Sequence, residues 1–75
     1  MNYKNYIVRN PEIMLGKPII NGTRITVDLI MRKLASGYTI EKLIESYPHL
    51  IQEQIFAALE YAADLIANEE IVEIL

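Results

Sequence analysis

Four basic side chains in the first half of the chain have the residue type and spacing to bind an anion. Lys17 and Arg24 flank a short segment rich in β-formers, and Arg32 and Lys33 follow about two helical turns later. Ammonium and guanidinium groups hold phosphate oxygens, so these four residues are candidate contacts to a DNA backbone. The alternative is structural, with Arg24 paired to a carboxylate beside glycines that set turn geometry.

Catalysis finds no support in the pattern of residues. A nucleophilic site needs a base beside its nucleophile, and the one imidazole, His49, follows Pro48 next to an apolar pair. We interpret His49 as a turn or core residue. The chain has no cysteine, and its carboxylates have the spacing of solvated helix faces. We therefore expect neither a metal nor another cofactor, and we expect a protein that is not an enzyme.

The two halves of the chain have opposite charge, although the total is only -3. Residues 1–40 hold six lysines and arginines against two carboxylates, a net charge of +4. Residues 41–75 hold one lysine against eight carboxylates, a net charge of -7. A basic half attracts phosphate and an acidic half attracts a basic protein, so the split suggests two kinds of partner. Self-association of opposite ends is the alternative.

The chain has the length of one small domain, residues 1–75, and 52% of it is hydrophobic. Without a disulfide or a zinc site, a domain this small needs another source of stability, so we predict a homodimer through the N-terminal β segments or the third helices. The longest apolar run, residues 55–59, has five residues against roughly 20 for a membrane span. No export signal precedes it, which predicts a cytoplasmic protein without a membrane partner.

Local patterns predict the elements that must position these residues. Residues 6–8 favour a short strand, and residues 18–20 and 23–25 favour a hairpin around Asn21 and Gly22 with a type I′ turn. Apolar spacing then predicts helices that begin after Thr26 and Thr39 and near Gln52. The predicted plan is a short β segment or hairpin (1–26), a three-helix unit (27–67) and an apolar, acidic tail (68–75).

The predicted fold is mainly α, a three-helix helix-turn-helix bundle preceded by a short β-hairpin. Its third helix has exposed candidates without a lysine or arginine among them, which are Gln52, Glu53, Glu60, Tyr61 and Asp64. A helix that reads the major groove normally offers basic or amide groups. Gln52 and Gln54 can read adenine or can simply start the helix, and both interpretations stay open.

Three blocks of the sequence resemble a known family. They are PEIMLGKPIINGTRITV (11–27), LASGYTIEKLIESYPHL (34–50) and IFAALEYAAD (55–64). Together they resemble family 433 of the domains of unknown function, a prokaryotic group, over residues 6–64. The resemblance implies a homeodomain-like helix-turn-helix fold and an antitoxin similar to VapB, paired with a PIN-like ribonuclease toxin. The chain departs from the family at Ile51, where a Ser or Thr usually caps the third helix, so this helix start is expected to be frayed or shifted.

The functional hypothesis is an antitoxin-like module of a toxin-antitoxin pair. Its dimer would bind operator DNA through Lys17, Arg24, Arg32 and Lys33. Its C-terminal tail would bind the basic toxin through acidic and apolar side chains, which are Glu69, Glu70, Ile71, Val72, Ile74 and Leu75. The alternative for the tail is packing within the homodimer. The alternative for the whole chain is a protein-only interaction or adaptor module without DNA binding.

Overall fold

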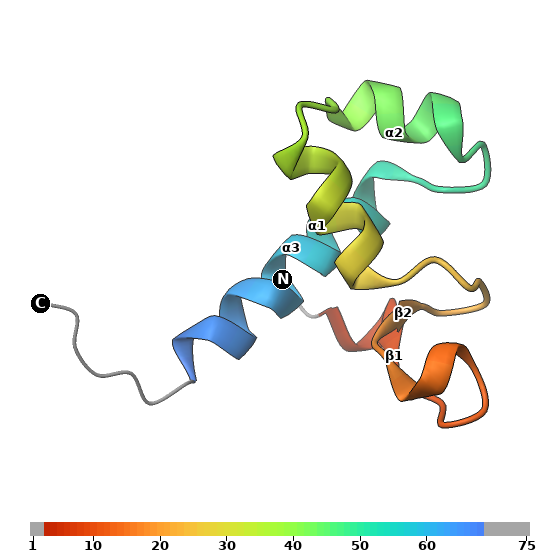
Figure 1. Cartoon of the computed structure of the whole chain (residues 1–75), viewed down its shortest axis with the longest axis vertical. Helices are drawn as coiled ribbons and strands as arrows, with labels where there is room; N and C mark the ends of the chain where they lie inside the picture. Colours follow the sequence, from red (N-terminus) through yellow and green to blue (C-terminus); the bar gives the residue numbers. More distant parts are fainter. Residues whose placement is uncertain (1–2, 69–75) are drawn as a thin grey trace, which may run out of the picture.

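The computed structural model describes residues 3–68, which form three helices behind a small β element (Figure 1). The helices are α1 (Val27–Ala35), α2 (Ile40–Ser46) and α3 (Gln52–Ala67). The strands are β1 (Ile7–Val8) and β2 (Ile19–Ile20), and two short 3-10 segments are η1 (Tyr3–Asn5) and η2 (Met14–Gly16). The predicted fold class, a mainly α three-helix unit preceded by a short antiparallel β element, is confirmed.

The β element pairs differently from the predicted hairpin. β1 and β2 are antiparallel, with Ile7 opposite Ile20 and Val8 opposite Ile19. The chain does turn at residues 21–22, where the Thr23 N–H donates to the Ile20 carbonyl at 3.0 Å. Residues 23–25 form no strand there, because the Thr23 hydroxyl donates to the Ile20 carbonyl and accepts from the Ile25 N–H. These bonds hold residues 23–25 in a turn, so the strand partner of β2 is the upstream β1. On the other edge of β2, the Ile20 N–H donates to the Ile25 carbonyl and the Val27 N–H donates to the Pro18 carbonyl, both at 2.9 Å.

The turn between β2 and α1 also has a different type from the one predicted. Gly22 has a φ of +85°, while Asn21 is not among the residues with positive φ. A positive φ at the second central residue alone is the pattern of a type II turn, whereas type I′ requires it at both. The prediction of a type I′ turn was therefore wrong. Beyond the turn, a single bridge joins Ile19 to Thr26.

The first two helices are capped as the sequence predicts. The Thr26 hydroxyl accepts the Leu29 N–H at 2.9 Å, and the Thr39 hydroxyl accepts the Lys42 N–H at 3.0 Å. Each bond satisfies one of the backbone donors that a helix start leaves open. Gly37, with a φ of +106°, lies just beyond α1 and turns the chain toward α2.

The third helix starts at Gln52 despite the missing Ser or Thr cap. Ile51 has no side-chain acceptor, but the side-chain amide Oε1 of Gln54 accepts the Ile51 N–H at 2.9 Å. This is the second half of a capping box, in which a glutamine at the third helical position reaches back to the cap residue. The expected shift of this helix start was therefore wrong, and Gln54 is a helix-start residue.

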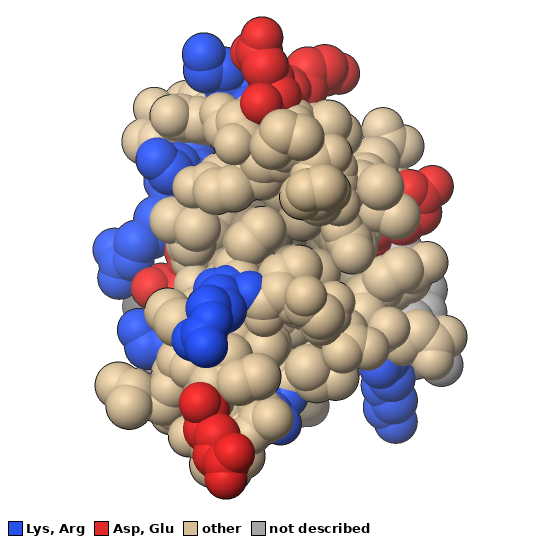
Figure 2. All heavy atoms as spheres, turned by 90° about the vertical axis from the view of Figure 1, so that its right-hand side faces the viewer, with Lys and Arg blue, Asp and Glu red and all other residues tan. Residues whose placement is uncertain are grey.

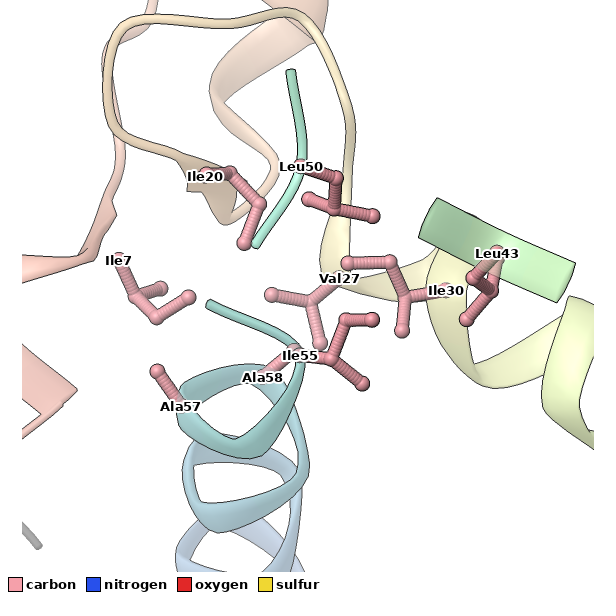
Figure 3. Close-up of a cluster of buried hydrophobic side chains, with 9 residues drawn as sticks. All are labelled: Ile7, Ile20, Val27, Ile30, Leu43, Leu50, Ile55, Ala57 and Ala58. Carbon is pink, nitrogen blue, oxygen red and sulfur yellow. The ribbon is translucent and has the colours of Figure 1, made fainter. Parts of the chain in front are cut away.

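The core lies where all the elements meet on one side of α3. Its buried side chains come from both strands, all three helices and the turn before α3, and they are Ile7, Ile20, Val27, Ile30, Leu43, Leu50, Ile55, Ala57 and Ala58 (Figure 3). The small side chains of Ala57 and Ala58 let neighbouring elements approach α3 closely. α3 contacts β1, η1, α1 and α2, so it is the common packing partner of the fold.

A polar and aromatic contact ties the N-terminal segment to α3. The Arg9 guanidinium donates to the Tyr61 hydroxyl from Nε at 3.1 Å and from Nη2 at 2.9 Å. The Tyr3 and Tyr61 rings meet edge to face with centroids 5.4 Å apart. Tyr3 and Tyr61 therefore help to pack the N-terminal segment against α3.

The segment η2 is a left-handed turn. Met14, Leu15 and Gly16 have φ values of +50°, +59° and +80°, and 92% of the Leu15 surface is exposed. Two N–H groups close the turn, Gly16 to the Ile13 carbonyl and Lys17 to the Met14 carbonyl, both at 3.1 Å. Left-handed backbone is unfavourable for methionine and leucine because Cβ crowds the following carbonyl. The turn therefore stores strain while it holds an apolar side chain in water.

Candidate interaction surfaces

The four predicted phosphate contacts lie on loops and on α1. Lys17 precedes β2, Arg24 lies in the turn between β2 and α1, and Arg32 and Lys33 lie in the last turn of α1. Lys17, Arg24 and Arg32 are exposed and Lys33 is half-buried. Figure 2 shows basic side chains mostly along one side of the visible face, with acidic side chains at its top, at its bottom and at its opposite edge. The basic surface is a scattered band rather than a continuous patch.

Two of these four side chains have intramolecular contacts. The Arg32 Nε lies 3.0 Å from the Asp28 Oδ1, an i,i+4 pair whose side chains are 80% and 50% exposed. The Lys33 Nζ lies 4.9 Å from the centroid of the Tyr38 ring. An exposed ion pair contributes about 0 to 1 kcal/mol, so a phosphate can replace Asp28 at Arg32 with little loss. The contact with Asp28 is thus compatible with a DNA role for Arg32.

The turn around Gly22 brings together two blocks that are far apart in the sequence. A groove of about 370 Å³ runs between residues 22–25 and residues 46–49, lined by Gly22, Thr23, Ile25, Ser46, Tyr47, Pro48 and His49. His49 is exposed in the connection between α2 and α3, which confirms its interpretation as a turn residue. The Thr23 hydroxyl is already hydrogen-bonded within the turn, to the Ile20 carbonyl and the Ile25 N–H. Within residues 3–68, no three carboxylates or imidazoles gather as metal ligands.

The outward face of α3 shows what the sequence reasoning missed. Apolar residues recur along the whole of α3, but Phe56 is 40% exposed and Ile66 is 65% exposed. The buried residues of α3 are Ile55, Ala57 and Ala58. α3 therefore has a second apolar stripe that faces away from its own core. The 3,4,3 spacing of residues 56, 59, 63 and 66 was the available signal for this stripe.

Acidic side chains lie along α3 beside this stripe. Glu53, Glu60 and Asp64 recur at intervals of seven and four residues, so they follow one side of the helix. Asp64 lies beside the Tyr3 phenol, whose pKa is raised by burial and then by the hydrogen bond and the charge of Asp64. The helix from Gln52 to Ala67 contains no lysine, arginine or histidine. Its charge is wholly negative.

The predicted toxin contacts Glu69, Glu70, Ile71, Val72, Ile74 and Leu75 lie outside the described residues. The structure describes α3 through Ala67, with Asn68 as its C-terminal cap. None of the helices within residues 3–68 combines the length and apolar character that crossing a membrane requires.

A family model described as "Protein of unknown function (DUF433)" matches residues 7–62. The chain belongs to the DUF433 family. The match spans the β element, α1, α2 and most of α3, which confirms the resemblance of the three sequence blocks. Within the matched segment, α3 packs against β1, α1 and α2.

Two relatives extend this finding. The DUF433 chain is 32% identical over 59 residues to the uncharacterised protein y4eO of Sinorhizobium fredii, a match that covers 79% of this chain and 27% of that protein. It is similar to the crystal structure of a DUF433 member from Anabaena variabilis, with a TM-score of 0.78, 30% identity, and coverage of 81% of this chain and 60% of that one. The chain therefore spans about a quarter of the first relative and three fifths of the second.

Proposed function

We propose that this DUF433 chain is an antitoxin-like binding protein that captures a basic partner, a PIN-like ribonuclease toxin. The observation that carries the proposal is the charge of α3, which holds three carboxylates and no basic side chain between Gln52 and Ala67. In a helix-turn-helix unit this helix usually enters the major groove, where phosphates surround it. A wholly acidic helix is repelled there and is attracted to a basic protein.

The role proposed is binding rather than catalysis, in the cytoplasm, with the toxin as a stoichiometric partner. The resemblance to the VapB-like antitoxins supplies the class of partner, and the acidic α3 supplies the reason for the attraction. A ribonuclease must be basic around its RNA site, so an acidic surface can compete with RNA for it. We also propose a homodimer, tested by light scattering on the full chain at micromolar concentration, where a monomer mass would exclude it.

The test of the toxin proposal uses the protein encoded by the adjacent gene. The two proteins are expressed together, purified through a tag on one, and assayed for cleavage of RNA. A stable complex in which cleavage is blocked at equal molar amounts supports the proposal. An adjacent gene for an unrelated protein, or a nuclease that the DUF433 chain neither binds nor inhibits, would refute it and leave the adaptor function in its place.

Operator binding is a second candidate function, supported by the exposure of Lys17, Arg24 and Arg32 on loops and α1. If these residues and Lys33 contact phosphates, binding to the DNA upstream of the gene should weaken with salt, with a slope of about -0.9 per contact. The double change Arg24→Ala plus Lys33→Ala should flatten that slope by about two contacts. Lys42→Ala, on α2 among acidic residues, is the matched control. An unchanged slope would remove the basic band as the DNA site.

A protein-only adaptor remains the alternative to both functions. The acidic α3 favours it over any function that requires this helix to read DNA. Absence of binding to the upstream DNA at low salt, together with capture of a partner that is not a nuclease, would establish the adaptor and exclude the antitoxin.

A further inference from the structure

The outward apolar stripe of α3 consists of Phe56, Leu59, Ala63 and Ile66. Their spacing of three, four and three residues keeps them in one line along the helix, over about 15 Å at 1.5 Å per residue. Phe56, Ala63 and Ile66 are exposed, while Leu59 is half-buried and packs against the edge of the core, so the line lies mostly on the outward side of α3. An apolar line of this spacing is the seam with which a helix packs against another helix.

The stripe is hollowed at its centre. Phe56, Leu59, Glu60 and Ala63 line a shallow depression of about 450 Å³. The small side chain of Ala63 leaves room for a large side chain of the partner between Phe56 and Ile66. Glu60 borders the same depression, so an entering apolar group would have a carboxylate at its edge. Glu60 therefore contributes both to the wall of the depression and to its negative charge.

The acidic row of α3, Glu53, Glu60 and Asp64, decides what can occupy the stripe. A second copy of the chain packed through α3 would bring two such rows together, and α3 offers no basic side chain to neutralise either of them. Like charges at the edge of a helical seam oppose pairing, whereas opposite charges favour it and set its orientation. A partner with lysine or arginine beside its apolar residues fits this face better than a second copy does.

We propose that the stripe docks an amphipathic helix of the basic partner protein, with the lysines or arginines of that helix facing Glu53 and Glu60. This inference rests on the proposed function, because it identifies the surface on which the partner is captured. It also assigns any homodimer contact to another part of the chain. The apolar contacts supply the affinity, and the one-sided acidic row fixes the direction in which the partner helix lies.

The test uses two labelled probes and the full chain. One probe is an amphipathic helical peptide of leucine and lysine, and the other has glutamate in place of lysine. We expect the leucine-lysine peptide to bind and the leucine-glutamate peptide not to bind.

In the chain itself, Phe56→Ala plus Ile66→Ala should weaken binding of the leucine-lysine peptide about 10- to 100-fold. The matched control is Leu65→Ala, because Leu65 is 50% exposed on the same helix but outside the stripe. Glu60→Gln should weaken binding and lower its salt dependence, whereas Glu41→Gln on α2 should change neither.

Three results would overturn the inference. They are equal binding of both peptides, an equal loss in Leu65→Ala, and conversion of a dimer to a monomer by the double change in the stripe, which would make a second copy the occupant. Circular dichroism and thermal unfolding of each variant establish that the fold is retained. A variant that fails to fold is replaced by Phe56→Gln plus Ile66→Gln, which exchanges the two exposed apolar side chains for polar ones.

The same variants separate this inference from the proposed function. If the protein of the adjacent gene binds the double variant as tightly as the parent chain, the docking surface is wrong while the antitoxin function stands. If that protein does not bind at all but the leucine-lysine peptide binds in a stripe-dependent way, the surface stands and the antitoxin function falls.

Discussion

Replacing Leu15 with glycine should stabilise the protein. Leu15 has a φ of +59° and 92% of its surface is exposed, so its side chain contributes little burial to the fold. A left-handed conformation costs an L-residue roughly 1 to 2 kcal/mol, which glycine avoids. Glycine also gives the unfolded chain more freedom, at a cost of about 0.4 to 1 kcal/mol. The expected net gain for Leu15→Gly is about 0.5 to 1 kcal/mol in the free energy of unfolding.

The assay is urea unfolding of the full chain followed by circular dichroism, with thermal unfolding beside it. For a domain of this size the gain should raise Tm by about 2 to 8 °C. Leu15→Ala is the control, because it removes the same exposed atoms but keeps the Cβ that causes the strain. Its stability should stay within about 0.5 kcal/mol of the parent chain. A loss of stability in Leu15→Gly, or an equal gain in Leu15→Ala, would show that the left-handed turn is not strained.

Three further predictions address the caps, the core and the alkaline limit of stability. Gln54→Ala should cost about 1 kcal/mol in urea unfolding, because it removes the acceptor of the Ile51 N–H, whereas Gln52→Ala should cost less. Ile30→Ala should cost about 2 to 5 kcal/mol in the same assay, because Ile30 is fully buried. The fold favours the neutral Tyr3 phenol, so its contribution is present below pH 10.0 and is lost as pH rises through the raised pKa. Tyr3→Phe should abolish that part of the alkaline loss; an unchanged profile would contradict the assignment.

The helices were predictable because their signals are local. Thr26 and Thr39 each accept a backbone N–H three residues later, so neighbouring residues alone decide these two helix starts. The strand pairing was less predictable, because β2 could pair with either neighbour in the sequence. β2 has β1 as its strand partner and only isolated contacts with residues 25–27, because the Thr23 hydroxyl holds residues 23–25 in a turn. The left-handed turn had no signal, since methionine and leucine rarely adopt that conformation.

The candidate surfaces were predictable only in part, for a related reason. The basic residues and the acidic character of the third helix are visible in the composition of each half of the chain. The exposure of Phe56 and Ile66 cannot be read from the sequence, because apolar residues lie around most of α3 and periodicity does not tell which side meets the core. The neighbours of α3 decide it, and they come from residues far away in the sequence, such as Ile7 and Ile30.

The position of α3 in the chain has a consequence for how the protein is made. Translation delivers β1, β2, α1 and α2 before the helix that packs against β1, α1 and α2 and closes the core. Until α3 emerges, Ile30 and Leu43 cannot pack with Ile55 in the core. Arg9 likewise lacks its hydrogen-bond acceptor, the Tyr61 hydroxyl, which lies 52 residues downstream. Folding is therefore completed only after most of the domain has left the ribosome. A chain interrupted before Gln52 lacks α3 and exposes its apolar core residues to chaperones and proteases.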